Sequence, residues 1–329
     1  MIRDLLMPVD ELTRRRLLGG GLALGAVAVA ACGDDDPDAS SSPEPSRDRQ
    51  AFTDSLGRTV EIPRRPQRIV SLHQFTSGEA LLSIGAPLVG LAPDEADGFA
   101  PAITAEYDLS DVESVGMFSE VDLEDVARLR PDLIVAYSSR GVLYPENLDI
   151  GELQRIAPTV ALDEETRRDE FMDLVGTITG LQDEVTRQRE QFEAELSELR
   201  AELGDSAADP TVAMVAYYEP DVLLLSDVHP IPYVTIPLDL GLRQPALAAS
   251  EELYVTLSVE RVTDIEADLV TYEPVGDPSA LALWDRLPAV RAGQAHEVPT
   301  VPGNSYASCR TALEVLRPLL LSARGDVVP

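Results

Sequence analysis

The sequence predicts an α/β protein made of two Rossmann-like lobes with parallel-type sheets, joined by one long α-helix. Short apolar runs alternate with amphipathic segments along most of the chain, which is typical of parallel strands covered by helices. Residues 170–203 carry a helical apolar period. Two segments, VDLEDVARLRPDLIVAYSS and LSVERVTDIEADLVTYEPV, repeat one arrangement of helix and strand. This repetition indicates that the two halves are related lobes.

Residues 1–31 have the character of an export signal. Arg14, Arg15 and Arg16 precede an apolar run of about a dozen residues, shorter than the roughly 20 that a membrane-spanning helix needs. The arginines resemble a twin-arginine signal, and the closing VAAC resembles a lipobox, whose cysteine becomes the lipidated first residue of the mature chain. We therefore expect an exported protein anchored through Cys32 to the outer face of the cytoplasmic membrane. The alternative is an ordinary cleaved signal, with Cys32 as an incidental thiol.

Residues 32–50 are polar, acidic and rich in Ser and Pro. Such a segment cannot bury enough apolar surface to fold, so we expect a disordered tether between membrane and folded domain.

The composition of the chain disfavours two classes of binding partner. The net charge of -32 disfavours nucleic acid and anionic lipid surfaces, because both would be repelled. All 26 basic residues are Arg. Cys32 and Cys309 are the 2 cysteines, so acylation of the first leaves no pair for an intrachain disulfide.

The predicted first lobe, residues 51–166, alternates strands and helices after an initial hairpin. Gly57 supplies the hairpin turn, Ser77 resembles a helix cap, and Pro131 stops a helix. The predicted elements are a hairpin over 52–62, strands over 67–72 and 87–92, helices over 77–86 and 123–129, a buried-type strand over 133–137, and a helix followed by a strand over 152–162.

The region 167–206 is predicted to be the single helix between the lobes. Its apolar residues recur at steps of three, four or seven, while acids and arginines fill the other face. Unbroken, it would be roughly 50 Å long at 1.5 Å per residue. A coiled-coil dimer is the competing interpretation, which Gly176 and Gly180 disfavour. The apolar residues are Phe171, Leu174, Val175, Ile178, Leu181, Val185, Phe192, Leu196, Leu199 and Leu203.

The predicted second lobe, residues 207–329, restarts the alternation. It begins with the strand in PTVAMVAYYEP and continues with a helix that contains Glu260 and a strand that ends at Tyr272. A last strand falls within 283–299, and a closing helix covers 307–323.

Several of these stretches together resemble the substrate-binding proteins of bacterial ABC importers for ferric siderophores, haem and cobalamin. The resemblance runs through DSLGRTVEIPRRPQRIVSL, LEDVARLRPDLIVA, IAPTV, LSVERVTDIEADLV and LPAVRAGQAHEVP, in that order. It implies a ligand cleft between two α/β lobes that a rigid helix holds with little hinge closure. Open α/β sheets bind ligands beyond the carboxyl ends of their strands, so loops after strands should line this cleft.

Glu124 and Glu260 occupy the positions at which the resembled family places one exposed docking glutamate on each lobe. There the two carboxylates pair with arginines of the membrane permease. The alternative is helix capping, since a carboxylate in a first turn interacts favourably with the helix dipole.

Strand ends of the first lobe supply the first cleft candidates. Tyr137, Ser139 and Arg140 follow a predicted strand, and the resembled siderophore-binding members often place an arginine here. A guanidinium can grip negatively charged hydroxamate or citrate oxygens at two points, although it could equally serve a surface salt bridge. His73 and Phe75 follow the first strand of the lobe, where the histidine is expected to make a polar contact.

In the second lobe, Tyr217, Tyr218 and Tyr272 are strand-end aromatic residues that could contact a ligand or belong to the core. Weaker candidates are Tyr233, Tyr306, Asn304 and Trp284, the last of which is expected to be structural.

The sequence argues against an enzyme and against a bare metal ion. It contains no GxSxG elbow, no HExxH and no CxxC, and a GxxxxGK[ST] loop is impossible without lysine. With only His73, His229 and His296, we expect no metal site and no cofactor, so that iron would be held by the siderophore.

The predicted function is therefore the capture of a ferric siderophore, of hydroxamate or citrate type because of Arg140, by a monomer that delivers it to the permease dimer of an ABC transporter. Cobalamin and haem are the alternative ligands. A sensor lipoprotein and a hydrolase are more distant alternatives.

Overall fold

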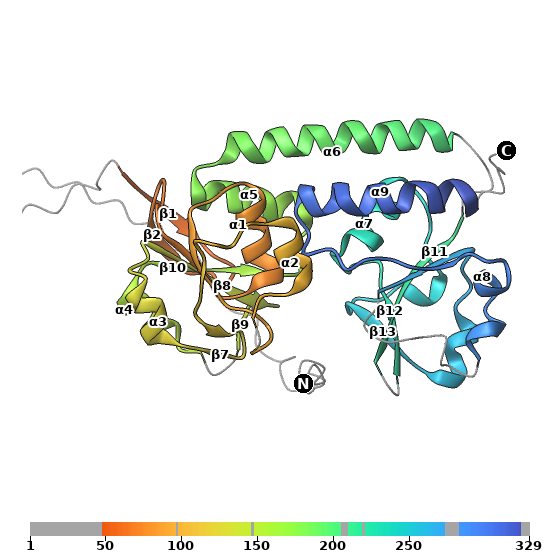
Figure 1. The fold of residues 1–329 in the computed structure, drawn as a ribbon, viewed down its shortest axis with the longest axis horizontal. Helices are drawn as coiled ribbons and strands as arrows, with labels where there is room; N and C mark the ends of the chain where they lie inside the picture. The colour runs from red at the N-terminus through yellow and green to blue at the C-terminus, as the bar shows by residue number, and fades with distance from the viewer. Residues whose placement is uncertain are drawn as a thin grey trace, which may run out of the picture. The chain divides into compact units, whose positions relative to one another are not determined.

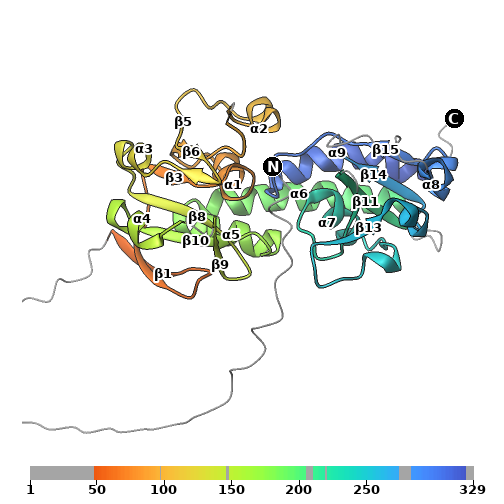
Figure 2. The ribbon, with the colours of Figure 1, turned by 90° about the horizontal axis from the view of Figure 1, so that it is seen from below.

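The computed structural model describes residues 48–96, 98–145, 148–204, 210–218, 221–273 and 283–323, without the side chains of Tyr218 and Asp221. The predicted export signal, Cys32 and nearly all of the predicted tether lie outside these residues. The described residues belong to one compact unit, Pro45–Pro329, and form two α/β lobes joined by a long helix, as Figures 1 and 2 show. The predicted fold class is thus confirmed.

The first lobe begins with the predicted hairpin. Strands β1 (Arg49–Thr53) and β2 (Thr59–Pro63) pair antiparallel around Gly57, whose φ of 73° is the left-handed conformation that glycine adopts without strain. Phe52, Val60 and Ile62 point into the core.

The sheet of the first lobe has the strand order β10-β8-β3-β4-β5, and these neighbours are parallel. Strand β9 (Val142–Tyr144) adds to β8 antiparallel, and β6 (Gly116–Met117) pairs antiparallel with β7 (Glu120–Val121). Six of the seven residues of β8, in the sequence LIVAYSS, are buried, as expected for a central parallel strand. The five parallel strands are β3 (Ile69–Ser71), β4 (Leu88–Leu91), β5 (Glu113–Ser114), β8 (Leu133–Ser139) and β10 (Thr159–Asp163).

Helices cover both faces of this sheet. One face carries α3 (Leu123–Arg128) and α4 (Ile150–Ile156) over a core that includes Val126 and Leu153. The other face packs against α1 (Glu79–Ser83) and α5. A π-helical turn, Gln74–Gly78, precedes α1, so the cap is His73 rather than the predicted Ser77. Helix α2 (Pro101–Glu106) follows β4.

The predicted single helix over 167–206 is in fact two helices. Helix α5 (Arg168–Thr179) ends at Gly180, which has a φ of 71°, and α6 (Gln182–Leu203) runs on as a separate helix of 22 residues. The N–H groups of Gly180 and Leu181 both donate to the Gly176 carbonyl, which closes the end of α5. Helix α6 alone spans both lobes and is about 33 Å long at 1.5 Å per residue.

The sheet of the second lobe is mixed, so the expectation of a parallel-type sheet is corrected here. Its order is β13-β12-β11-β14-β15, with β11, β14 and β15 parallel and with β12 antiparallel to both neighbours. Only residues 219–220 separate β11 from β12, and so short a connection permits only an antiparallel return. The strands are β11 (Val212–Tyr218), β12 (Asp221–Leu225), β13 (Tyr254–Ser258), β14 (Leu269–Tyr272) and β15 (Ala295–Glu297).

The predicted α-helix around Glu260 is a 3₁₀ helix, Val259–Asp264. Three of its six residues are β-branched, and Ser258 makes no capping bond, whereas Asp122 caps α3 with its Oδ1. The corresponding segments of the two lobes are therefore less alike than their sequences predicted. The other helical segments are α7 (Pro232–Asp239), α8 (Pro288–Arg291), α9 (Tyr306–Ala323) and the 3₁₀ helices Ala246–Ala248 and Trp284–Arg286.

Helices α6 and α9 give the two lobes a shared core. In Figure 1, α6 runs above both lobes and α9 lies beneath it, and the two helices are packed against each other. Phe192 and Leu199 of α6 and Leu316 of α9 belong to one buried cluster that continues into both sheets. The lobes are therefore connected by packing as well as by the chain.

Candidate ligand-binding site

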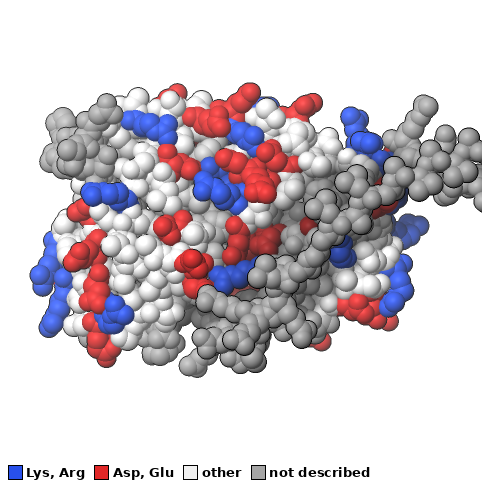
Figure 3. All heavy atoms as spheres, turned by 180° about the vertical axis from the view of Figure 1, so that it is seen from behind, with Lys and Arg blue, Asp and Glu red and all other residues white. Residues whose placement is uncertain are grey.

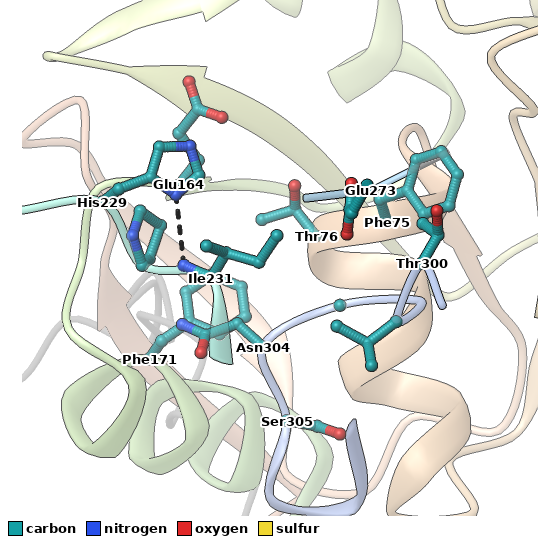
Figure 4. A pocket seen from close by; sticks show the side chains of 13 residues that line it. Phe75, Thr76, Glu164, Phe171, His229, Ile231, Glu273, Thr300, Asn304 and Ser305 are labelled. Atoms are coloured by element: carbon teal, nitrogen blue, oxygen red, sulfur yellow. Dashed lines mark hydrogen bonds between the residues drawn. The ribbon is translucent and has the colours of Figure 1, made fainter. Parts of the chain in front are cut away.

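A cavity of about 280 Å³ lies between the lobes, at the carboxyl ends of strands from both sheets. The first lobe contributes residues that follow β3 and β10, together with one residue of α5, Phe171. The second lobe contributes residues that follow the parallel strands β14 and β15, together with His229, Pro230 and Ile231 from the connection between β12 and α7 (Figure 4). This is the place at which open α/β sheets bind ligands. The lining residues are Phe75, Thr76, Glu164, Phe171, His229, Pro230, Ile231, Glu273, Thr300, Val301, Gly303, Asn304 and Ser305.

A second cavity of about 470 Å³ shares His229 and Pro230 with the first. It lies between the start of α5 and α7 and is lined largely by charged side chains. They are Glu165, Arg167, Arg168, Asp169, Asp227 and Asp239.

Among the predicted residues, Phe75 lines the first cavity. It follows β3 in the π-helical turn, which carries its backbone beyond the edge of the sheet. Asn304, a weaker candidate, also lines it. Tyr233 and Tyr306 are fully buried in the core instead.

His73 and Tyr137 lie beside the cavity in an aromatic cluster. Their rings stack at 4.6 Å, and Phe118 packs edge-on against His73, also at 4.6 Å. The backbone N–H of Thr76 donates to His73 Nδ1 at 3.1 Å, and Nε2 faces Asp94 at 3.4 Å. Both nitrogens of His73 are therefore occupied, as the expected polar contact requires.

Arg140 and Ser139 are engaged by carboxylates. Arg140 Nε donates to Glu165 at 2.9 Å, and its NH2 group lies 2.8 Å from Glu252, which belongs to the second lobe. Ser139 Oγ donates to Glu165 at 3.1 Å. Neither residue lines the first cavity, and Arg140 forms an exposed ion pair between the lobes, which is the surface role considered as its alternative.

The tyrosines of the second lobe lie elsewhere. Tyr217 and Tyr272 pack against the buried cluster of that lobe, where Tyr272 meets Trp284 edge-on at 5.6 Å. Neither lines the cavity. Trp284 is buried, as predicted for a structural residue. The Tyr218 side chain lies outside the described part of the structure.

Sequence reasoning missed Glu164, Phe171, His229 and Glu273. Glu164 and Glu273 come directly after β10 and β14, so the position immediately after a strand was the signal that could have identified them. No pattern in the sequence marks Phe171 or His229 for a cleft.

Burial changes the protonation of the cavity walls. It raises the pKa of Glu273 to about 7 and also raises the pKa of Glu164. It lowers the pKa of His229 to about 4, so this imidazole is neutral. Glu273 Oε1 and Asn304 Oδ1 are buried and have no hydrogen-bond partner among the described residues.

A buried polar network holds the lobes together at the base of the cleft. The Glu79 carboxylate of α1 accepts from Ser305 Oγ at 2.6 Å and Ser308 Oγ at 2.9 Å at the start of α9. Burial raises the pKa of this carboxyl, although those hydrogen bonds oppose the shift. Arg168 of α5 pairs with Asp239 of α7 at 2.8 Å. These contacts cross from one lobe to the other.

Glu124 and Glu260 are both exposed and both lie in the first turn of a helical segment. Neither carboxylate forms an ion pair with any residue that the structure describes. On the face shown in Figure 3, by contrast, arginines commonly lie among acidic side chains.

Within the described ranges, no group of three or more His, Cys, Asp and Glu side chains could hold a metal ion. No helix in the same ranges is long and apolar enough to cross a membrane.

Two α/β lobes, a connecting helix and a cavity at the carboxyl ends of both sheets define a bilobed solute-binding protein. The model of the family described as periplasmic binding protein matches residues 79–300, and the chain belongs to this family.

The particular relatives bind iron complexes according to their names. The probable siderophore-binding lipoprotein YfiY of Bacillus subtilis (strain 168) is 26% identical over 88% of this chain and 92% of its own length. The Fe(3+)-citrate-binding protein YfmC of the same organism is 26% identical over 84% and 86%. The structure of FhuD2 from Staphylococcus aureus with bound ferrioxamine B has a TM-score of 0.67 at 20% identity, over 79% of this chain and 100% of that one.

Proposed function

We propose that this protein is an extracytoplasmic solute-binding lipoprotein that captures a ferric siderophore and delivers it to the permease dimer of an ABC transporter. The observation that carries the proposal is the cavity of about 280 Å³ between the lobes, at the carboxyl ends of both sheets. The siderophore-binding and ferric-citrate-binding names of the two Bacillus relatives support iron complexes as the ligand class.

Iron is proposed to enter as part of the chelate, because the described residues contain no cluster able to hold the bare ion. The protein then acts as a binder rather than as an enzyme, with no cofactor of its own. A lipid on Cys32 would keep the protein at the outer face of the cytoplasmic membrane, and the tether would let the folded part reach the permease.

Haem is a poorer ligand than a siderophore for this cleft. His229 is the histidine that lines it, and its Nδ1 accepts the Ile231 N–H at 3.2 Å. A neutral ring with this bond carries its proton on Nε2, so neither nitrogen offers a free lone pair to haem iron. Nothing in the described cleft favours cobalamin specifically.

A binding assay tests this function. Trp284 contacts Tyr272, which directly precedes Glu273 of the cavity, so its fluorescence should respond to a ligand in the cleft. We expect one or more ferric siderophores to quench it with micromolar or lower dissociation constants, and haem and cobalamin to bind more weakly. If no siderophore in a panel of hydroxamate, citrate and catecholate types binds, the proposal is wrong.

A further inference from the structure

The described lining of the cavity offers hydrogen-bond acceptors and, above the pKa of about 7 of Glu273, negative charge, but no cation. Its ionisable lining residues are Glu164, Glu273 and His229, and the pKa of His229 lies too low for it to be charged near neutral pH. None of the described lining residues is an arginine.

Two acceptor atoms of residues that line the cavity lack hydrogen-bond donors among the described residues. Glu273 Oε1 and Asn304 Oδ1 are both buried, and neither has a partner among the residues that the structure describes. Figure 4 shows that they reach the cavity from different sides. A buried acceptor without a donor costs free energy, so a ligand that supplies N–H groups would remove this cost.

Two arginines near the cleft, Arg140 and Arg168, are already engaged by carboxylates, whereas Arg167 of the neighbouring cavity forms no ion pair with a described residue. Arg140 is held between Glu165 and Glu252. Arg168 pairs with Asp239, and its guanidinium lies 4.6 Å from the centre of the Phe192 ring.

Carboxylates outnumber arginines in the neighbouring cavity as well. Arg167 and Arg168 line it beside acids on both lobes, which are Glu165, Asp169, Asp227 and Asp239. A ligand that extends from the first cavity into the second would therefore meet a surplus of negative charge there.

Building on the proposed siderophore-binding function, we propose that the cleft selects ferric chelates without net negative charge, whose amide or ammonium N–H groups donate to Asn304, Glu273 and Glu164. Three hydroxamates neutralise one ferric ion, and a pendant ammonium makes such a chelate cationic. Ferric citrate complexes keep excess negative charge, which the ionised carboxylates of Glu164 and Glu273 repel. We therefore expect the cleft to prefer ferric hydroxamates to ferric citrate. The reason is that its carboxylates repel anionic chelates, not that Arg140 attracts them.

The first experiment compares three iron complexes by fluorescence titration of the purified protein at about pH 8, above the pKa of about 7 of Glu273. The probes are ferrioxamine B, which carries a pendant ammonium, ferrichrome, which is neutral and has amide N–H groups, and anionic ferric citrate. We expect at least one of the two hydroxamates to bind at least about tenfold more tightly than ferric citrate. Tighter binding of ferric citrate, or binding of anionic chelates alone, overturns the charge selection but leaves the siderophore-binding function intact. Binding of no siderophore overturns both.

The second experiment removes one charge without changing the shape of the side chain. Glu273→Gln keeps a carbonyl oxygen acceptor, so we expect it to weaken ferrioxamine B binding by about tenfold and ferrichrome binding by less than about threefold. The matched control is Glu266→Gln, because Glu266 is exposed and lines neither cavity. Equal losses for both ligands, or an unchanged affinity for ferrioxamine B, would show that the charge of Glu273 does not select the ligand. An unchanged unfolding midpoint or a raised one rules out misfolding as the cause of a loss.

Discussion

Burial of Glu273 in the cleft destabilises the folded protein when this carboxyl is ionised. Its pKa moves from 4.5 to about 7, which corresponds to about 3 kcal/mol of unfavourable free energy for the ionised form. A ligand that donates to this carboxylate would recover part of that cost. Residues that bind ligands commonly trade stability for function in this way.

This cost predicts a pH-dependent gain in stability for Glu273→Gln. Because the folded pKa of about 7 exceeds the unfolded value of 4.5, the penalty is absent below about pH 4.5, grows between these values and is complete above about pH 7. We expect the variant to be more stable than the native protein by about 1–3 kcal/mol at about pH 8 and by almost nothing at about pH 4.5.

Thermal unfolding of both proteins at the two pH values provides the measurement. Glu79 and Glu164 also have raised pKa values, but they are present in both proteins and cancel in the difference. Tyr233, which interacts with Glu273, titrates only at much higher pH. A stability difference that is the same at both pH values would contradict the prediction.

Arg140 shows the limit of inference from a single residue type. Its position after a strand was predicted correctly, but its partners Glu165 and Glu252 lie 25 and 112 residues further along the chain. Whether a guanidinium is free to grip a ligand depends on such neighbours, which no local pattern reveals.

At the scale of elements, the turn between α5 and α6 decides how the lobes are connected. Gly180 adopts a φ of 71°, and a Cβ at this position would lie 2.5 Å from the backbone oxygen of Arg64. At Gly176, a Cβ would lie 3.1 Å from Val185 of α6. Gly176 therefore allows α5 to fold back closely against α6, and Gly180 allows the turn between them to pass close to the backbone of Arg64.

We expect Gly180→Ala to destabilise the protein by about 2–4 kcal/mol, because left-handed strain of about 1–2 kcal/mol adds to the clash with the backbone. The control is Gly85→Ala, where φ is 69° but a Cβ would meet nothing within 4 Å, so only the strain of about 1–2 kcal/mol applies. Urea unfolding of the two variants measures the difference. Equal losses would mean that the contact with Arg64 is unimportant.

Strand ends were predicted better than the directions of their side chains. The strand predicted over 133–137 is observed as Leu133–Ser139, and the strand predicted to end at Tyr272 does end there. However, Tyr217 and Tyr272 lie within their strands and pack against one face of the sheet, whereas Phe75 and Glu273 lie beyond strand ends and reach the cleft. An apolar run shows where a strand lies, but its side chains alternate between two faces that only packing distinguishes.

At the scale of the whole molecule, the base of the cleft is too well connected for a large hinge motion. Glu79 ties α1 to the start of α9, Arg168 ties α5 to α7, and the apolar cluster along α6 and α9 reaches both sheets. Opening this base would expose a buried carboxylate and a buried guanidinium, which is unfavourable. We therefore expect ligand binding to change the lobe positions only modestly.

Glu124 and Glu260 are exposed carboxylates, one on each lobe, that form no ion pair with a described residue, and such charges are suited to electrostatic docking on a partner. We expect Glu124→Ala and Glu260→Ala, combined in one protein, to reduce siderophore uptake by cells at least about tenfold, because rim charges steer and orient association. Neither residue lines either of the two described cavities, so the affinity for the ligand should stay within about twofold of the native value. Uptake of radioactive iron and fluorescence titration measure the two quantities.

The control for docking is Glu193→Ala, which removes an exposed carboxylate of α6. It should leave both uptake and affinity unchanged. Normal uptake in the Glu124 and Glu260 double variant would refute the docking role.

The sequence by itself determined the alternation of strands and helices in most of the first lobe, the two-lobed α/β class and several strand ends near which a ligand could bind, because apolar periodicity and turn residues are local properties. Only the tertiary structure decided that Gly180 divides the long helix, that β12 runs antiparallel, and that Glu164, Glu273 and Asn304 share one cavity. The shared cavity depends on contacts between residues far apart in the chain, such as Glu79 with Ser305, which are 226 positions apart. Burial, which changes the charges of the cleft, exists only once those distant segments have met.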